Sequence, residues 1–124
     1  MLGHLQTTFR ADPSKFDMSD NSISEDISSI LLNSYEIKFG HNNFIGRLPY
    51  LSPNVQYLDL SHNSFTGSIP CGWENLKGLV YINLWSNKLF GEVHLVELSN
   101  SKHLVVLNLG NNKFFGTIPI NIEN

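Results

Sequence analysis

Residues 58–70 have the sequence Leu-Asp-Leu-Ser-His-Asn-Ser-Phe-Thr-Gly-Ser-Ile-Pro, and variants of it recur along the chain of 124 residues. The other copies begin at Phe16, Ile37, Ile82 and Leu107. The asparagine that all five copies share occurs at Asn21, Asn42, Asn63, Asn87 and Asn112. Successive copies are therefore 21, 21, 24 and 25 residues apart. A period of this length predicts a solenoid in which each copy forms one turn.

The start of each copy has the pattern of a short β-strand. In Leu58-Asp59-Leu60, the two leucines point to one face of a strand and Asp59 points to the other. A single turn of about 20 to 25 residues cannot bury its own apolar side, so successive turns must stack. We therefore expect the strands to pair in parallel in front of one continuous apolar core.

The copies resemble the leucine-rich repeat. The Gly-x-Ile-Pro ending of the copies that begin at Leu58 and Leu107 resembles the plant extracellular subtype, which occurs in receptor-like proteins, receptor-like kinases and polygalacturonase-inhibiting proteins. The resemblance covers Phe16 to Asn124, although Glu25 replaces the glycine in the first copy. It implies an α/β leucine-rich-repeat solenoid, a curved horseshoe segment. The parallel sheet would lie on the concave face, with short turns or 3-10 or helical pieces on the convex face.

Several residue types in the repeat are expected to be structural. Each asparagine follows a strand, where its carboxamide can donate to and accept from unpaired backbone groups. We expect a polar ladder formed by Asn21, Asn42, Asn63, Asn87 and Asn112. The repeat glycines permit positive φ or close contact, and they are Gly46, Gly67, Gly91 and Gly116. Trp73 occupies an apolar position of the convex half and is predicted to be core.

The spacing predicts local departures from a uniform coil. The two 21-residue steps are short, and Tyr50–Asn54 is predicted to be a tight turn rather than a helix. The step of 25 residues predicts a local loop near residues 99–101.

The domain prediction is an irregular segment or partial repeat at 1–12, followed by about five repeats at 13–124. The last repeat is incomplete, and no cap is recognisable at either end, so we expect a piece of a longer protein. The single cysteine, Cys71, excludes a disulfide within the chain.

Composition argues against two classes of partner. The chain has 8 Lys+Arg and 11 Asp+Glu, a formal charge of −3, so it lacks the basic excess that favours nucleic acid. Its apolar runs are far shorter than the roughly 20 residues of a membrane-spanning helix. We therefore expect neither nucleic-acid binding nor direct insertion of this chain into a membrane.

Candidate ligand-binding residues lie on the face of the strands away from the core. One column holds Asp17, Lys38, Asp59, Asn83 and Asn108, and aromatic side chains accompany it at Tyr57, Tyr81 and Trp85. Aromatic residues dominate interface hot spots, which favours a docking surface. The alternative for the polar column is a solvated charge ladder of little energetic value. The alternative for Trp85 is a side chain folded over its neighbours.

No pattern in the chain predicts catalysis, a cofactor or a metal. His41 and His62 occupy the same place in adjacent copies and should be able to stack, but two ligands are too few for a metal site. Asp59, Ser61 and His62 are the residue types of a hydrolytic triad, yet His62 faces away from the other two. We predict that the chain is not an enzyme.

The predicted function is binding of a protein or peptide on the concave face. The family resemblance implies a plant cell-surface receptor-like protein, outside the plasma membrane, that perceives a ligand in defence or development. It also implies a co-receptor kinase as a partner in signalling. The alternatives are an inhibitor of a cell-wall hydrolase, similar to polygalacturonase-inhibiting proteins, and a structural fragment without a partner of its own.

Overall fold

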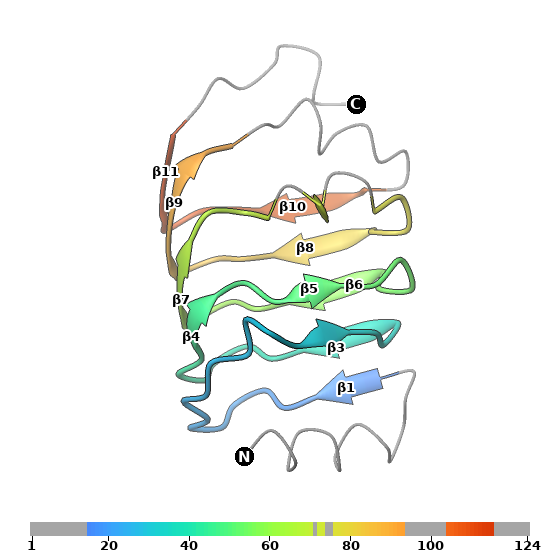
Figure 1. The fold of residues 1–124 in the computed structure, drawn as a ribbon, viewed down its shortest axis with the longest axis horizontal. Coiled ribbons are helices and arrows are strands. Elements are labelled where there is room, and N and C mark those ends of the chain that lie inside the picture. Colours follow the sequence, from blue (N-terminus) through green and yellow to red (C-terminus); the bar gives the residue numbers. More distant parts are fainter. Residues whose placement is uncertain (1–14, 71, 74–75, 94–103, 116–124) are drawn as a thin grey trace.

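A computed structural model describes residues 15–70, 72–73, 76–93 and 104–115. In these residues the chain forms about four turns of a solenoid made of three parallel sheets (Figure 1). Among the described residues, helical structure is confined to a short 3-10 turn at residues 72–73. The predicted leucine-rich-repeat solenoid is thus confirmed, with almost no helix on its back. Within the described part, no helix has the length and hydropathy that crossing a bilayer requires.

The front sheet contains the first strand of every repeat, in the order β1-β3-β6-β8-β10. Its strands are β1 (Lys15–Asp17), β3 (Glu36–Lys38), β6 (Tyr57–Asp59), β8 (Tyr81–Asn83) and β10 (Val106–Asn108). Equivalent residues of the repeat pair directly, so the apolar centre of each strand lies beside that of the next. These central residues point into the core, and they are Phe16, Ile37, Leu58, Ile82 and Leu107.

A second parallel sheet follows the bend in each repeat, where we expected only turns or short helical pieces. It has the order β11-β9-β7-β4 and contains β4 (Ile45–Arg47), β7 (Ser64–Gly67), β9 (Lys88–Glu92) and β11 (Lys113–Phe115). Its register is staggered, because Gly46 lies beside Phe65 and Gly67 lies beside Leu89. Each glycine therefore pairs with an apolar residue of the following turn rather than with its glycine. That apolar residue comes two positions before the glycine, as Phe65 does before Gly67.

A third sheet closes the back of the two shortest turns. Strand β2 (Leu31–Leu32) pairs in parallel with β5 (Tyr50–Leu51). The tight turn predicted over Tyr50–Asn54 is located at residues 53–54, after this strand. Equal steps of 21 residues bring the two short backs into register, whereas the following, longer turn has the 3-10 segment instead.

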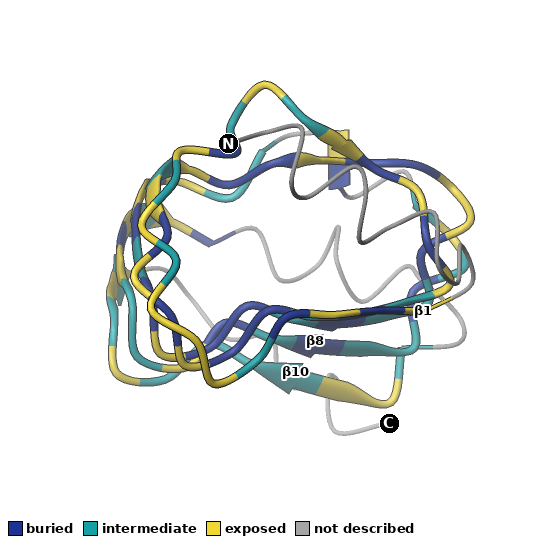
Figure 2. Cartoon of the chain, turned by 90° about the horizontal axis from the view of Figure 1, so that it is seen from below, coloured by how far each residue is buried: buried dark blue, intermediate teal, exposed yellow. Residues whose placement is uncertain are grey.

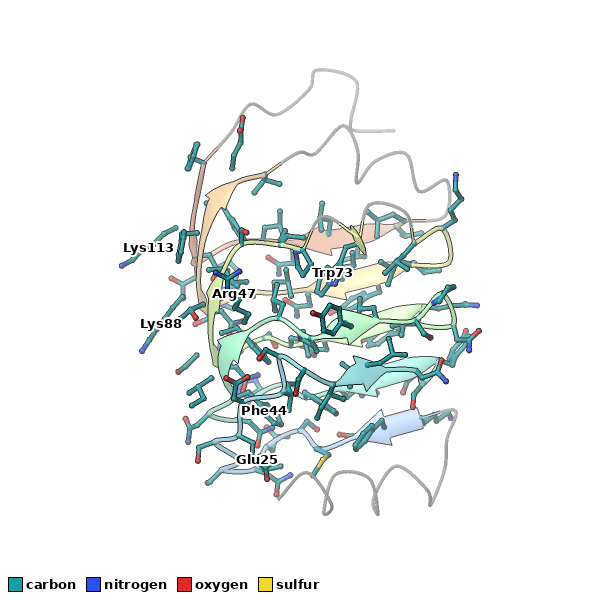
Figure 3. The ribbon with its side chains drawn as sticks, viewed as in Figure 1. Glu25, Phe44, Arg47, Trp73, Lys88 and Lys113 are labelled. Atoms are coloured by element: carbon teal, nitrogen blue, oxygen red, sulfur yellow. The ribbon has the colours of Figure 1, made fainter. Side chains whose placement is uncertain are left out.

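The core lies between these sheets. Figure 2 shows the stack of turns end on, with the front strands along one side of the outline. Phe39 contacts Phe16 edge to face at 4.9 Å and stacks on Phe44 at 5.2 Å between ring centroids. Trp73 is 3% exposed, which confirms the prediction that it is core (Figure 3).

Some predictions concern residues that the structure does not describe. The irregular segment at 1–12, the loop near residues 99–101, Cys71, Gly116 and the end of the last repeat, 116–124, all lie outside the described residues.

Candidate binding face

The bend between the front and second sheets is held by asparagine side chains, of which Asn63 is representative. In its own turn, Asn63 Nδ2 donates to the carbonyl oxygens of Leu60 and Ser61 at 3.1 and 3.0 Å. In the preceding turn it donates to the carbonyl of Phe39 at 3.0 Å, and its Oδ1 accepts from the Phe44 N–H at 3.1 Å. One side chain thus satisfies backbone groups of two turns that would otherwise be buried without partners.

The other asparagines of the predicted ladder repeat this arrangement, with one difference. Asn42, Asn87 and Asn112 each bond the backbone of their own turn and of the turn before. Asn21 is exposed, and among the described residues it bonds only the nearby carbonyls of Met18 and Ser19. Within the described residues, every bend after the first is therefore tied to the turn before it.

The predicted polar column lies on the outward side of the front sheet, which we call the front face. Register places Asp17, Lys38, Asp59, Asn83 and Asn108 side by side on adjacent strands. Adjacent strands in a sheet are about 4.8 Å apart, so the column is continuous.

Hydrogen bonds to the backbone two residues ahead fix the acceptors of this column. Asp59 Oδ1 accepts from the N–H and hydroxyl of Ser61 at 2.9 and 2.6 Å. Asn83 Oδ1 accepts from the Trp85 N–H at 3.0 Å. Ser19 makes the same pair of bonds to Asp17, and they are the main reason that the pKa of Asp17 is lowered. The polar side chains are thus ordered before any ligand arrives.

Lys38 does not pair with the aspartates on either side of it. Its Nζ lies 3.5 Å from Glu36 Oε1 on the same strand and 5.8 Å from the centroid of the Tyr57 ring. The ion pair is partly exposed, so we expect it to contribute only a few tenths of a kcal/mol. Its effect is chiefly to hold the ammonium beside the tyrosine.

Tyr57 and Tyr81 form the aromatic centre of the front face. Their rings stack with centroids 4.1 Å apart and planes 3° from parallel. Burial is the main cause that raises the pKa of Tyr57 to about 12, and hydrogen bonding to Tyr81 and the nearby carboxylates of Asp59 and Glu36 add to it. Asn83 Nδ2 donates to the Tyr81 hydroxyl at 3.3 Å, which links the aromatic pair to the polar column.

Trp85 combines the two alternatives considered for it. A methyl group added at Gly110 would lie 2.3 Å from Cζ3 of the indole, so the ring packs directly against this glycine. The side chain is nevertheless 40% exposed. Trp85 therefore covers its neighbour on one side and presents aromatic surface to solvent on the other.

The two histidines lie at the bend, away from the front face. His41 and His62 are exposed and stack with ring centroids 4.1 Å apart. Because Ser61 Oγ donates to Asp59 while His62 stacks on His41, the three residue types of a triad are not assembled. Among the described residues, no group of three His, Cys, Asp or Glu side chains could hold a metal ion.

A left-handed backbone position, which the repeat pattern had not indicated, lies just before each ladder asparagine. Five non-glycine residues there have φ between 52° and 61°: Asp20, His41, His62, Ser86 and Asn111. Asp, Asn and His are the side chains that most often tolerate this conformation. Their recurrence at one place in the repeat was the signal that could have revealed it.

Comparison with known proteins agrees with this geometry. Residues 54–76 and 103–124 match the Leucine Rich Repeat family. The receptor-like protein EIX2 of Solanum lycopersicum is 36% identical over 81 residues, which are 62% of this chain and 8% of that protein. The chain spans less than a tenth of the length of the curated relatives it matches.

Solved structures show the same fold. The crystal structure of a TDR receptor matches with a TM-score of 0.75 and 32% identity, covering 88% of this chain and 20% of the receptor chain. A chain of the BIR3–SERK2 complex from Arabidopsis thaliana matches with a TM-score of 0.62 and 28% identity, covering 77% of this chain and 58% of that one.

Proposed function

Because the chain is a leucine-rich-repeat protein related to plant receptor ectodomains, we propose that its front face binds a peptide or protein ligand. The observation that carries the proposal is the stacked pair Tyr57 and Tyr81 at the start of their strands, together with the exposed Trp85 two residues beyond the other end of β8. The repeat requires none of these aromatic side chains. Trp85 replaces the serine or glycine of the other copies, and the position of Tyr57 and Tyr81 is Lys15, Glu36 and Val106 in the remaining copies.

The chemistry of the front face suits a polypeptide partner. Stacked aromatic rings provide rigid apolar area at a small entropic cost, and such side chains are the usual anchors of interfaces. Asp59 and Asn83 are already fixed by backbone hydrogen bonds, so binding loses little of their conformational freedom. The remaining lone pairs of these acceptors can receive N–H groups of a ligand backbone.

The relatives support a place for this binding. We propose that the chain belongs to a receptor-like protein at the plant cell surface, where ligand binding outside the plasma membrane leads to a defence or developmental signal. A second protein, a co-receptor kinase, would complete the signalling assembly. The similar structure that contains BIR3 together with SERK2 supports a protein partner for repeats of this type.

The test uses a random peptide library displayed on phage and selected against the 124-residue chain. Selected peptides are then measured by fluorescence anisotropy with Trp85→Ala, and with Tyr50→Ala as the matched control. Tyr50 is 62% exposed but lies on the back sheet, away from the front face. We expect Trp85→Ala to weaken binding at least tenfold and Tyr50→Ala to leave it unchanged, as is typical of hot spots.

Circular dichroism of both variants accompanies the binding measurement. An unaltered spectrum together with equal affinity of Trp85→Ala and the parent chain would overturn the proposal. So would a loss of binding in Tyr50→Ala alone, because the ligand would then occupy the back of the solenoid.

A further inference from the structure

A second surface with a different chemistry lies on the outward side of the second sheet. We call it the side face, and it consists of Ile45, Arg47, Lys88, Phe90, Lys113 and Phe115. Alternation along β9 buries Leu89 and leaves Lys88 and Phe90 exposed on either side of it. Figure 3 shows Lys88 and Lys113 extending away from the second sheet on the same side of the molecule.

Register brings the three cations of the side face together. Arg47 and Lys88 both flank Thr66, from the strands on either side of β7. Two strand spacings place them about 10 Å apart. Lys113 lies beside Phe90 and hence diagonally across from Lys88, at about 7–8 Å between Cα atoms. Three positive charges therefore lie within reach of one short ligand.

Among ion pairs between two described residues, the one present joins Lys38 to Glu36, and none involves Arg47, Lys88 or Lys113. Two carboxylates accompany these cations. Asp26 lies against Gly46 and accepts from the Ser28 N–H at 2.8 Å, and Glu92 is exposed on β9 beside Phe115. Three cations and two carboxylates give this surface a formal net charge of +1, in a chain whose total formal charge is −3.

The cations alternate with exposed apolar side chains. Phe90 is 53% exposed and Phe115 is 65% exposed, and Lys113 lies between them in the sheet. Ile45 is 46% exposed next to Arg47. Large apolar side chains grouped in this way on a soluble surface mark a site of interaction.

We propose that the side face docks an acidic polypeptide segment that carries apolar side chains between its carboxylates. Its glutamates or aspartates would pair with Arg47, Lys88 and Lys113, and its apolar side chains would cover Phe90 and Phe115. A long polyanion such as a nucleic acid or an anionic membrane fits less well. Either ligand would extend more than a Debye length, about 8 Å, past the side face. There the cations of the side face no longer attract it, and the net negative charge of the rest of the chain disfavours its approach.

The test measures fluorescence anisotropy of a labelled 12-residue peptide with Glu-Glu-Leu repeated four times, titrated with the 124-residue chain. The variant Lys88→Gln/Lys113→Gln is compared with Lys15→Gln/Lys77→Gln, which removes two exposed lysines outside the side face. We expect the first variant to weaken binding roughly fivefold to tenfold, the value for two partly solvated ion pairs. The control variant should retain the parent affinity, and added salt should weaken binding of the parent chain.

A second set of probes separates the proposed partner from general anion binding. A peptide with Gln-Gln-Leu repeated four times should bind at least fivefold more weakly than the acidic peptide. The variant Phe90→Ser should weaken binding of the acidic peptide without changing the circular dichroism spectrum of the chain. Equal affinity of the two lysine variants would overturn the proposal. Tighter binding to phosphatidylserine vesicles or to oligothymidylate than to the acidic peptide would also overturn it, and would make the side face a site for those polyanions.

Discussion

The front sheet and the second sheet are formed by the same repeat, yet their outward side chains are organised differently. On the front face, Asp59 and Asn83 bond the backbone, and Tyr57 stacks on Tyr81. On the side face, Lys88 and Phe90 are exposed side chains on a strand whose buried residue is Leu89. The front face is therefore ordered by contacts within the protein, whereas the side face is supported from beneath by its buried residues.

The difference follows from register. Front strands pair equivalent positions, so identical or similar side chains form columns that stack and share hydrogen bonds. The second sheet is staggered by two residues, which places a glycine of one turn beside an apolar residue of the next. Its outward positions consequently bring unlike residues together, such as Lys113 and Phe90. Changes on the two faces should thus have different effects on stability.

The largest effect is expected where the two sheets join. Asn63→Ala removes hydrogen bonds to both turns at a site only 9% exposed, and leaves buried backbone groups without partners. Each such group costs about 1–3 kcal/mol, so we expect a loss of roughly 3 kcal/mol or more in the free energy of unfolding. Urea denaturation followed by circular dichroism measures it.

Asn21→Ala is the matched control, because Asn21 is exposed and, among the described residues, bonds only carbonyls of its own turn. We expect it to cost less than about 1 kcal/mol. Equal losses in the two variants would contradict the view that the ladder joins one turn to the next.

An intermediate effect is expected inside the second sheet. Gly46 has φ of 83°, and an added methyl group would lie 2.5 Å from the carboxylate of Asp26. Gly46→Ala should cost about 2 kcal/mol through backbone strain and displacement of Asp26. At Gly67, with the same φ, the nearest atom to an added methyl group is Arg47 Cγ at 3.4 Å, so Gly67→Ala should show the strain alone.

Thermal unfolding of three variants separates these contributions. Gly46→Ala should lower the melting temperature more than Gly67→Ala does, because only the former displaces Asp26. The double variant Asp26→Ala/Gly46→Ala should therefore regain this extra loss of stability. Lys88→Gln, on the outward side of the same sheet, should change stability by less than about 0.5 kcal/mol. A large loss in Lys88→Gln would remove the contrast between the supported side face and the ordered front face.

Much of the front sheet could be predicted from the sequence, for a physical reason. An apolar-x-apolar pattern fixes which side chains enter the core, and alignment of the copies fixes which residues become neighbours. These two facts place Tyr57 beside Tyr81 and His41 beside His62, and they put Trp73 in the core. Each of these placements depends on position along the repeat and needs no knowledge of a rotamer.

The second sheet could not be predicted in the same way. Its strands contain glycine at positive φ and vary outside the buried position, so local β-propensity is weak, and the strands form because turns stack. Lys38 forms its ion pair with Glu36 rather than with the aspartates on the adjacent strands, and this depends on side-chain rotamers. So does the packing of Trp85 on Gly110, which the repeat pattern leaves open.

The smallest effect tests whether the front face is ordered without a ligand. The raised pKa of Tyr57, about 12, means that the folded protein holds the phenol proton more tightly than the unfolded chain, whose tyrosines titrate near 10. Stability from this residue is therefore present below pH 10 and is lost as the pH rises toward 12.

Absorbance at 295 nm should show a tyrosine transition near pH 12 that is missing in Tyr57→Phe. In Tyr81→Phe, the loss of one hydrogen-bond partner should move this transition to lower pH. If the transition near pH 12 persisted in Tyr57→Phe, it would belong to another tyrosine, and the stacked pair would not be the ordered centre of the front face.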